Sequence, residues 1–75
     1  MNAKARKQIG RLREQLEQIK AQFEDLQQVE EEKLENVPEA LREGDAAQGM
    51  ETAISGLSET IDHLDSAISS VDEIE

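Results

Sequence analysis

Two stretches of this chain repeat apolar residues at alternating steps of three and four, and this spacing constrains the fold more than any other feature. The residues are Ile9, Leu12, Leu16, Ile19, Phe23 and Leu26 in the first stretch and Ala47, Met50, Ile54, Leu57, Ile61, Leu64, Ile68 and Val71 in the second. They occupy the a and d positions of heptads, which lie on one face of an α-helix, whereas a strand would alternate with period two. The sequence therefore predicts two long helices, over about residues 3–35 and 46–73.

Residues 36–45 are predicted to interrupt the helical pattern. Pro38 fixes its own φ angle and disfavours helical geometry at Val37, so the long helix has to stop here. We expect one short helical turn over residues 38–43, with Val37 and Leu41 covering the loop end of the structure.

The start of the second helix carries two local signals. Gly44 is expected to end the preceding turn in a left-handed conformation. Asp45, followed three residues later by Gln48, is typical of a capping box, in which Asp45 accepts from free backbone N–H groups.

Two long helices joined by a short connection are expected to fold back as an antiparallel hairpin, giving one all-α domain over residues 1–75. Antiparallel packing sets an a residue against a d residue, and six such pairs share one register because their residue numbers add up to 80. The pairs are Ile9–Val71, Leu12–Ile68, Leu16–Leu64, Ile19–Ile61, Phe23–Leu57 and Leu26–Ile54. A slip by one heptad is the alternative that the pattern leaves open.

The two edges of this hairpin differ in charge. At the e positions the first helix carries Arg13 and Lys20, and the second carries Glu51, Asp65 and Asp72, so this edge is expected to form ion pairs. The g positions hold no charge, and they are Gln8, Gln15, Gln22, Val29, Ala53, Thr60, Ala67 and Ile74.

An uncharged g edge beside the a and d residues widens the apolar stripe to about three positions in seven, which is the pattern of a bundle helix. A lone two-helix hairpin buries few side chains against the entropy of ordering the chain. We therefore predict a homodimer that forms a four-helix bundle, with a monomer bearing a semi-polar surface as the alternative. The residues predicted at the oligomer interface are Val29, Ala53, Thr60, Ala67 and Ile74.

The charge of the chain is strongly negative and uneven. Eight Lys and Arg stand against 18 Asp and Glu, for a net charge of -10, which argues against direct binding to nucleic acid. Residues 1–20 nevertheless hold six basic and two acidic residues, leaving two basic and sixteen acidic residues in 21–75. Rows of carboxylates on the second helix predict a partner-binding surface, unless they serve solubility alone. The residues predicted to bind a partner are Glu51, Glu59, Asp62, Asp65 and Asp72.

No catalytic, cofactor or metal site is predicted. His63 follows Glu59 by four residues, a spacing that can hold a metal on a helix, but it falls at a solvent-facing position and no second His exists. The acidic run from Glu30 to Glu35 lacks the turn glycine of a calcium loop, which favours a solvated helix end. Without Cys or a Gly-rich phosphate loop, the serines have no catalytic partners, so we do not expect an enzyme.

The sequence also predicts where the protein resides. It has no cysteine, no run of about 18 apolar residues and no apolar core of a signal peptide near Met1. We expect a cytoplasmic protein with no membrane partner.

Two segments carry a resemblance to known proteins. They are Asn36-Val37-Pro38-Glu39-Ala40-Leu41 and Gly49-Met50-Glu51-Thr52-Ala53-Ile54, followed by Leu57, Ile61, Leu64 and Ile68. Over about residues 30–74 the chain resembles short acidic helical-hairpin proteins of phages and bacterial mobile elements, which share a pattern like Asn-Met-Pro-Glu-x-Leu. It departs from them at Ser55 and Ser69, where Glu is usual. The resemblance implies a phage-like origin and an interaction with a host protein, and it implies no catalytic activity.

Three hypotheses for function follow. The first is a non-catalytic, homodimeric module that binds a host protein. The second is an inhibitor that mimics nucleic acid and blocks a host defence or DNA-handling enzyme. The third is a small-ligand sponge, with a pocket between protomers near Arg11 or Arg42.

Overall fold

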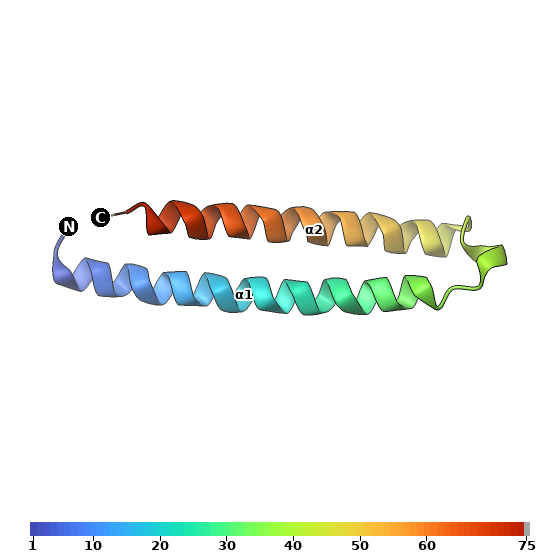
Figure 1. Ribbon diagram of the computed structural model, residues 1–75, viewed down its shortest axis with the longest axis horizontal. Coiled ribbons are helices and arrows are strands. Elements are labelled where there is room, and N and C mark those ends of the chain that lie inside the picture. The colour runs from blue at the N-terminus through green and yellow to red at the C-terminus, as the bar shows by residue number, and fades with distance from the viewer. Residues whose placement is uncertain (75) are drawn as a thin grey trace.

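The protein is a helical hairpin. The computed structural model describes residues 1–74, so the last residue of the predicted domain lies outside the described part. Helix α1 (Ala3–Glu35) and helix α2 (Asp45–Asp72) are joined by a short 3₁₀ helix, η1 (Glu39–Leu41). The helices run antiparallel side by side and bring the two termini to the same end (Figure 1). The predicted all-α hairpin is confirmed.

Local interactions fix both ends of α1. Asn2 caps its start, where the side-chain Oδ1 accepts a hydrogen bond of 2.8 Å from the backbone N–H of Ala5. At the other end, Pro38 has φ -55° and ψ 140°, which takes the chain out of helical geometry. The Arg42 guanidinium donates to the carbonyl oxygens of Glu35 (3.3 Å) and Val37 (3.4 Å), so it satisfies acceptors that the helix end leaves free.

The start of α2 differs from the prediction. Gly44 is the N-cap of α2 with φ -76° and ψ 168°, so the expected left-handed conformation is wrong. Asp45 is the first helical residue, and Gln48 donates from Nε2 to the carbonyl of Glu43 (3.2 Å), so the expected capping box is also wrong. A Cβ on residue 44 would lie 3.1 Å from the carbonyl oxygen of Leu41. A side chain at this position would require the Leu41 carbonyl to shift by a few tenths of an ångström, so the close approach of the backbone favours glycine without a positive φ.

The loop end is covered less than predicted. Val37 is half-buried, but Leu41 is 61% exposed, so the expectation that both close this end is wrong for Leu41. The connecting helix η1 has only three residues where six were predicted to turn, and it leaves Leu41 on its outer side.

The hairpin is a thin rod with almost no interior. Its principal extents are 60 × 15 × 12 Å and its radius of gyration is 17.4 Å, against about 11 Å for a compact domain of this length. Among the described residues only Ala47, Ile61 and Ile68 are buried, and all three belong to α2. Neither helix within residues 1–74 has a stretch long and apolar enough to cross a lipid bilayer.

Helix α1 presents a different face to α2 than the heptad pattern predicts. Its a residues and its e residues are half-buried, and these are Ile9, Arg13, Leu16, Lys20, Phe23, Gln27, Glu30 and Leu34. The d residues Leu12, Ile19 and Leu26 are 50%, 43% and 54% exposed, so the prediction that they lie within the seam is wrong. The stripe on α1 is wider than one neighbouring helix can cover, and the ion pairs at the e positions turn α1 so that its d row faces outward.

Candidate binding surfaces

One edge of the hairpin is held by ion pairs between the helices. Arg13 meets Asp72 in a two-pronged contact, with Nε 2.5 Å from Oδ1 and Nη2 3.0 Å from Oδ2. One heptad further along α1, Lys20 Nζ lies 2.6 Å from Asp65 Oδ1. Both pairs were predicted from the e positions, and they confirm that this edge pairs basic residues of α1 with acidic residues of α2.

These contacts shift the ionisation of the groups that make them. The hydrogen bond from Arg13 lowers the pKa of Asp72, and the same bond raises the pKa of Arg13. The hydrogen bond to Asp65 raises the pKa of Lys20. Because the side chains of Asp65 and Asp72 are 55% and 51% exposed, the pairs act more on the register of the helices than on the free energy of unfolding.

We define the acidic edge as Glu51, Glu59, Asp62, Asp65 and Asp72, the five predicted partner-binding residues, all of which are exposed. Two of them, Asp65 and Asp72, are engaged by the cations of α1. Glu51, Glu59 and Asp62 make no ion pair with a Lys or Arg anywhere in residues 1–74. These three carboxylates are therefore the part of the acidic edge that is free to meet another molecule.

The acidic residues do not gather into a metal site. His63 Nε2 lies 3.6 Å from Glu59 Oε1, with the two side chains 76% and 75% exposed. Glu30, in the acidic run of α1, pairs with Lys33 at 3.0 Å. Within residues 1–74 no group of three or more His, Cys, Asp or Glu lies close enough together to hold a metal ion.

The opposite side of the hairpin is an uncharged surface that we call the open face. It consists of Leu12, Ile19, Leu26 and Val29 on α1 and Ala53, Thr60, Ala67 and Ile74 on the α2 side. The large side chains are only half covered, with Val29 47% and Ile74 50% exposed. The open face contains all five residues predicted at the oligomer interface. It also includes the d row of α1, which was predicted to lie inside the hairpin. The predicted width of the apolar stripe, about three positions in seven, already indicated that one helix could not cover all of it.

A shallow groove follows part of the open face. Its lining from α1 is Leu26, Val29 and the ion-paired Glu30 and Lys33, and its lining from α2 is Ala53, Gly56, Leu57 and Thr60. A Cβ added at Gly56 would meet nothing within 4 Å, so packing inside the hairpin does not require glycine there. Glycine in a helix costs about 1 kcal/mol relative to alanine, and no contact within a single hairpin offsets this cost at Gly56.

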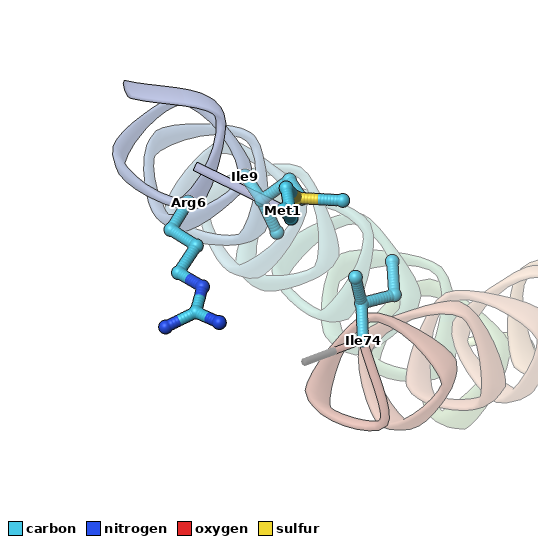
Figure 2. Close-up of a pocket in the computed structure, with 4 residues that line it drawn as sticks. All are labelled: Met1, Arg6, Ile9 and Ile74. Carbon is cyan, nitrogen blue, oxygen red and sulfur yellow. The ribbon is translucent and has the colours of Figure 1, made fainter. Parts of the chain in front are cut away.

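The apolar surface continues to the end of the rod where the termini meet. Met1, Ile9 and Ile74 line a depression of about 410 Å³ there, and Met1 is 61% exposed. Figure 2 shows the guanidinium of Arg6 pointing away from these three apolar side chains. The depression extends the open face past the last turn of α2.

The two arginines predicted near a ligand pocket lie in different settings. Arg42 is committed to backbone carbonyls at the end of α1. Arg11 is exposed on α1 and makes no ion pair within residues 1–74. The pocket was predicted between protomers, near one arginine or the other, so it stays a prediction that a single chain does not test.

Fold and surfaces together define a class: a small helical-hairpin protein with an ion-paired acidic edge on one side and an uncharged apolar face on the other. No family model, curated protein or solved structure matches the chain. The proposals that follow therefore depend on its own geometry.

Proposed function

We propose that this chain is a non-catalytic protein-binding module that pairs through its open face into a homodimeric four-helix bundle. One observation carries the proposal: the open face runs along the rod with no charged residue among its eight members, and its largest side chains are half-exposed. A contiguous apolar surface of this kind marks an interaction site more often than a free surface.

The energetics favour covering this face with other helices. Fully burying a Leu, Ile or Val side chain contributes roughly 1.5–3 kcal/mol, and about half of that remains to be gained by a side chain that is half-exposed. Leu12, Ile19, Leu26 and Val29 would then contribute about 4 kcal/mol per chain when a second hairpin covers them. That gain adds to the small stability of a rod with only three buried residues.

The same pairing leaves the acidic edge available to a partner. Glu51, Glu59 and Asp62 lie away from the open face and would point outward from the bundle. We propose that they meet a basic surface on a protein, which in a chain of phage-like origin would be a host protein. Complementary charge of this kind speeds association and selects the partner.

A second candidate is inhibition by mimicry of nucleic acid. Free carboxylates on a rigid rod with a net charge of -10 favour it, since they could occupy the DNA-binding groove of a host defence or DNA-handling enzyme. Mimicry predicts that DNA competes with the chain for the partner and that affinity falls steeply as salt rises. Docking through apolar contacts would survive both tests.

The first measurement is the mass of the chain by sedimentation equilibrium at micromolar concentration. A mass of two chains is expected, and a mass of one chain would overturn assembly through the open face.

The partner is then sought by pulldown from host lysate with matched charge variants. The variant Glu51→Lys/Glu59→Lys/Asp62→Lys should lose a partner that the wild type retains. Its control, Glu31→Lys/Glu35→Lys/Glu39→Lys, changes the net charge equally at exposed positions near the loop and should retain the partner. Equal retention by both variants would exclude the acidic edge as the binding surface.

A further inference from the structure

We infer that the two copies pack head to tail, with α1 against α1 of the partner subunit and the two loops at opposite ends of the bundle. The inference rests on the proposed dimer and specifies its geometry. Two facing hairpins have two symmetric choices. A two-fold axis along the rods puts both loops at one end and α1 against α2 of the other copy, whereas an axis across the rods reverses one copy.

A row of residues beside the open face is complementary to itself when reversed. The residues that immediately precede Leu12, Ile19 and Leu26 in the sequence belong to an exposed row on α1, whose members are spaced seven residues apart. The series is Lys4, Arg11, Gln18, Asp25 and Glu32. Its charges run from positive through neutral to negative. A two-fold axis across the rod at Gln18 sets Lys4 level with Glu32 of the partner subunit and Arg11 level with Asp25 of the partner subunit.

The charges of this row are not used within the hairpin. Among residues 1–74, Lys4, Arg11, Asp25 and Glu32 make no ion pair, and Glu32 only accepts a long hydrogen bond of 3.5 Å from Gln28. By contrast, the cations on the e row, which faces α2 from the other side of α1, are paired with that helix. The row beside the open face therefore carries complementary charge that one copy leaves unsatisfied.

The apolar rows of the open face share the centre of the charge row. Leu12, Ile19 and Leu26 are centred on Ile19, one residue from Gln18. The row on α2, which runs from Ala53 to Ile74, is centred between Thr60 and Ala67. The contact between Lys20 and Asp65 shows that this level of α2 lies beside the middle of α1. A single two-fold axis across the rod therefore aligns the charged row of α1 and the apolar rows of both helices with the same rows of the second copy.

The other arrangement offers the basic residues fewer carboxylates. It would place Lys4 and Arg11 beside α2 of the partner subunit, where the row beside the open face is Gly49, Gly56, His63 and Ser70 and holds no carboxylate, and the row beyond it holds only Glu59 and Glu73. It would also bring the two basic ends of the rods together. Charge complementarity thus selects the reversed arrangement.

The orientation can be measured with one spin label per chain, because the sequence has no cysteine. Ala40 is exposed in the connector, so Ala40→Cys accepts a label without disturbing either helix. If the loops lie at opposite ends, the distance between the two labels, measured by pulsed electron paramagnetic resonance, should be close to the 60 Å length of the rod. Loops at the same end predict about 10–20 Å, since packed helices lie 8–10 Å apart.

A charge-swap cycle tests the contact itself. Arg11→Glu and Asp25→Arg should each weaken the dimer about three- to tenfold, and the double variant should recover most of the loss because the swapped residues again meet opposite charge. Arg6→Glu/Glu24→Arg, which makes the same exchange off this row, serves as the control and should show no such recovery. A dimer with labels about 20 Å apart, or a double variant no tighter than the singles, overturns the orientation while the dimer stands. A monomer overturns the orientation and the proposed dimer together.

Discussion

Replacing two apolar residues of the open face by glutamine should dissociate the proposed dimer without unfolding α1. We choose Ile19→Gln/Leu26→Gln because both side chains lie on the outward d row, 43% and 54% exposed. Glutamine forms helices nearly as well as leucine, so the helix itself should persist. The a and e residues that face α2 are untouched.

The size of the effect follows from how much of each side chain is still uncovered. A fully buried Ile or Leu contributes roughly 1.5–3 kcal/mol, so the uncovered half contributes about 1 kcal/mol when a second copy covers it. Two side chains in each of two copies give about 4 kcal/mol, which corresponds to a dissociation constant weaker by about a thousandfold.

Sedimentation equilibrium over a range of concentrations measures this shift directly. Circular dichroism gives a second readout, because the Tm of a dimer rises with concentration and that rise should vanish in the variant. The control Ser55→Gln/Ser66→Gln adds two glutamines at exposed positions of α2 away from the open face and should match the wild type. A dissociation constant within about threefold of wild type in the Ile19/Leu26 variant would refute the open face as the interface.

Three further predictions test the hairpin itself. Ile68→Ala removes one of the few buried side chains and should lower the free energy of unfolding by about 2 kcal/mol in urea titrations. The pKa of Asp72 in the hairpin lies below its ordinary value of 3.8, so the stability that its contact with Arg13 contributes is fully present above pH 3.8 and is lost as pH falls through the lowered pKa. Asp72→Asn should therefore lose less stability than wild type on acidification below that pH, and identical acid curves would contradict the contact. Gly10→Ala and Gly56→Ala should each stabilise the helix by up to about 1 kcal/mol, but only Gly56→Ala, on the open face, should also weaken the dimer in sedimentation.

The sequence predicted the hairpin because each signal for it is local or periodic. Apolar spacing identifies a helix without knowledge of its neighbours, and Pro38 marks the interruption through its own backbone. Residues at e positions, such as Arg13 and Asp72, lie along the same edge in every register that aligns the apolar rows. Opposite charge across this edge was therefore predictable from residue types and numbering alone, whereas the pairing of Arg13 with Asp72 belongs to the one register whose paired numbers add up to 80.

The face that α1 turns to α2 was not predictable in the same way. Apart from Glu30 and Lys33 near the end of α1, the a, d and g positions of the helices are uncharged, so a partner could cover either side of the stripe with a similar apolar gain. The choice depends on the e residues: the Lys20 side chain is only 21% exposed because it lies across the seam to reach Asp65. A heptad pattern assigns a residue such as Lys20 to the edge of the seam. It contains no information about how much apolar area the methylene groups of the lysine side chain cover.

Gly44 illustrates a second limit. Glycine before a helix is consistent with a left-handed residue and equally with a backbone too crowded for a Cβ. The distinction depends on where the carbonyl of Leu41 lies, 3.1 Å from that missing atom, and this position is set by the short η1 turn. The sequence correctly indicated that position 44 favours glycine, whereas the reason for it could be found only in the structure.

The length of the rod explains why the charges at its two ends favour a reversed second copy. Six of the eight basic residues lie in the first twenty positions, and the hairpin uses Arg13 and Lys20 to hold the far end of α2. The acids nearest the loop, including Asp25 and Glu32, lie toward the other end of a rod 60 Å long. Charges so far apart are screened over a Debye length of about 8–10 Å, so Lys4 and Arg11 gain nothing from those acids within one chain. In the proposed dimer, a second copy lying in the opposite direction brings them within reach, so that one row of charges holds the chain's own helices and another row selects the direction of its partner.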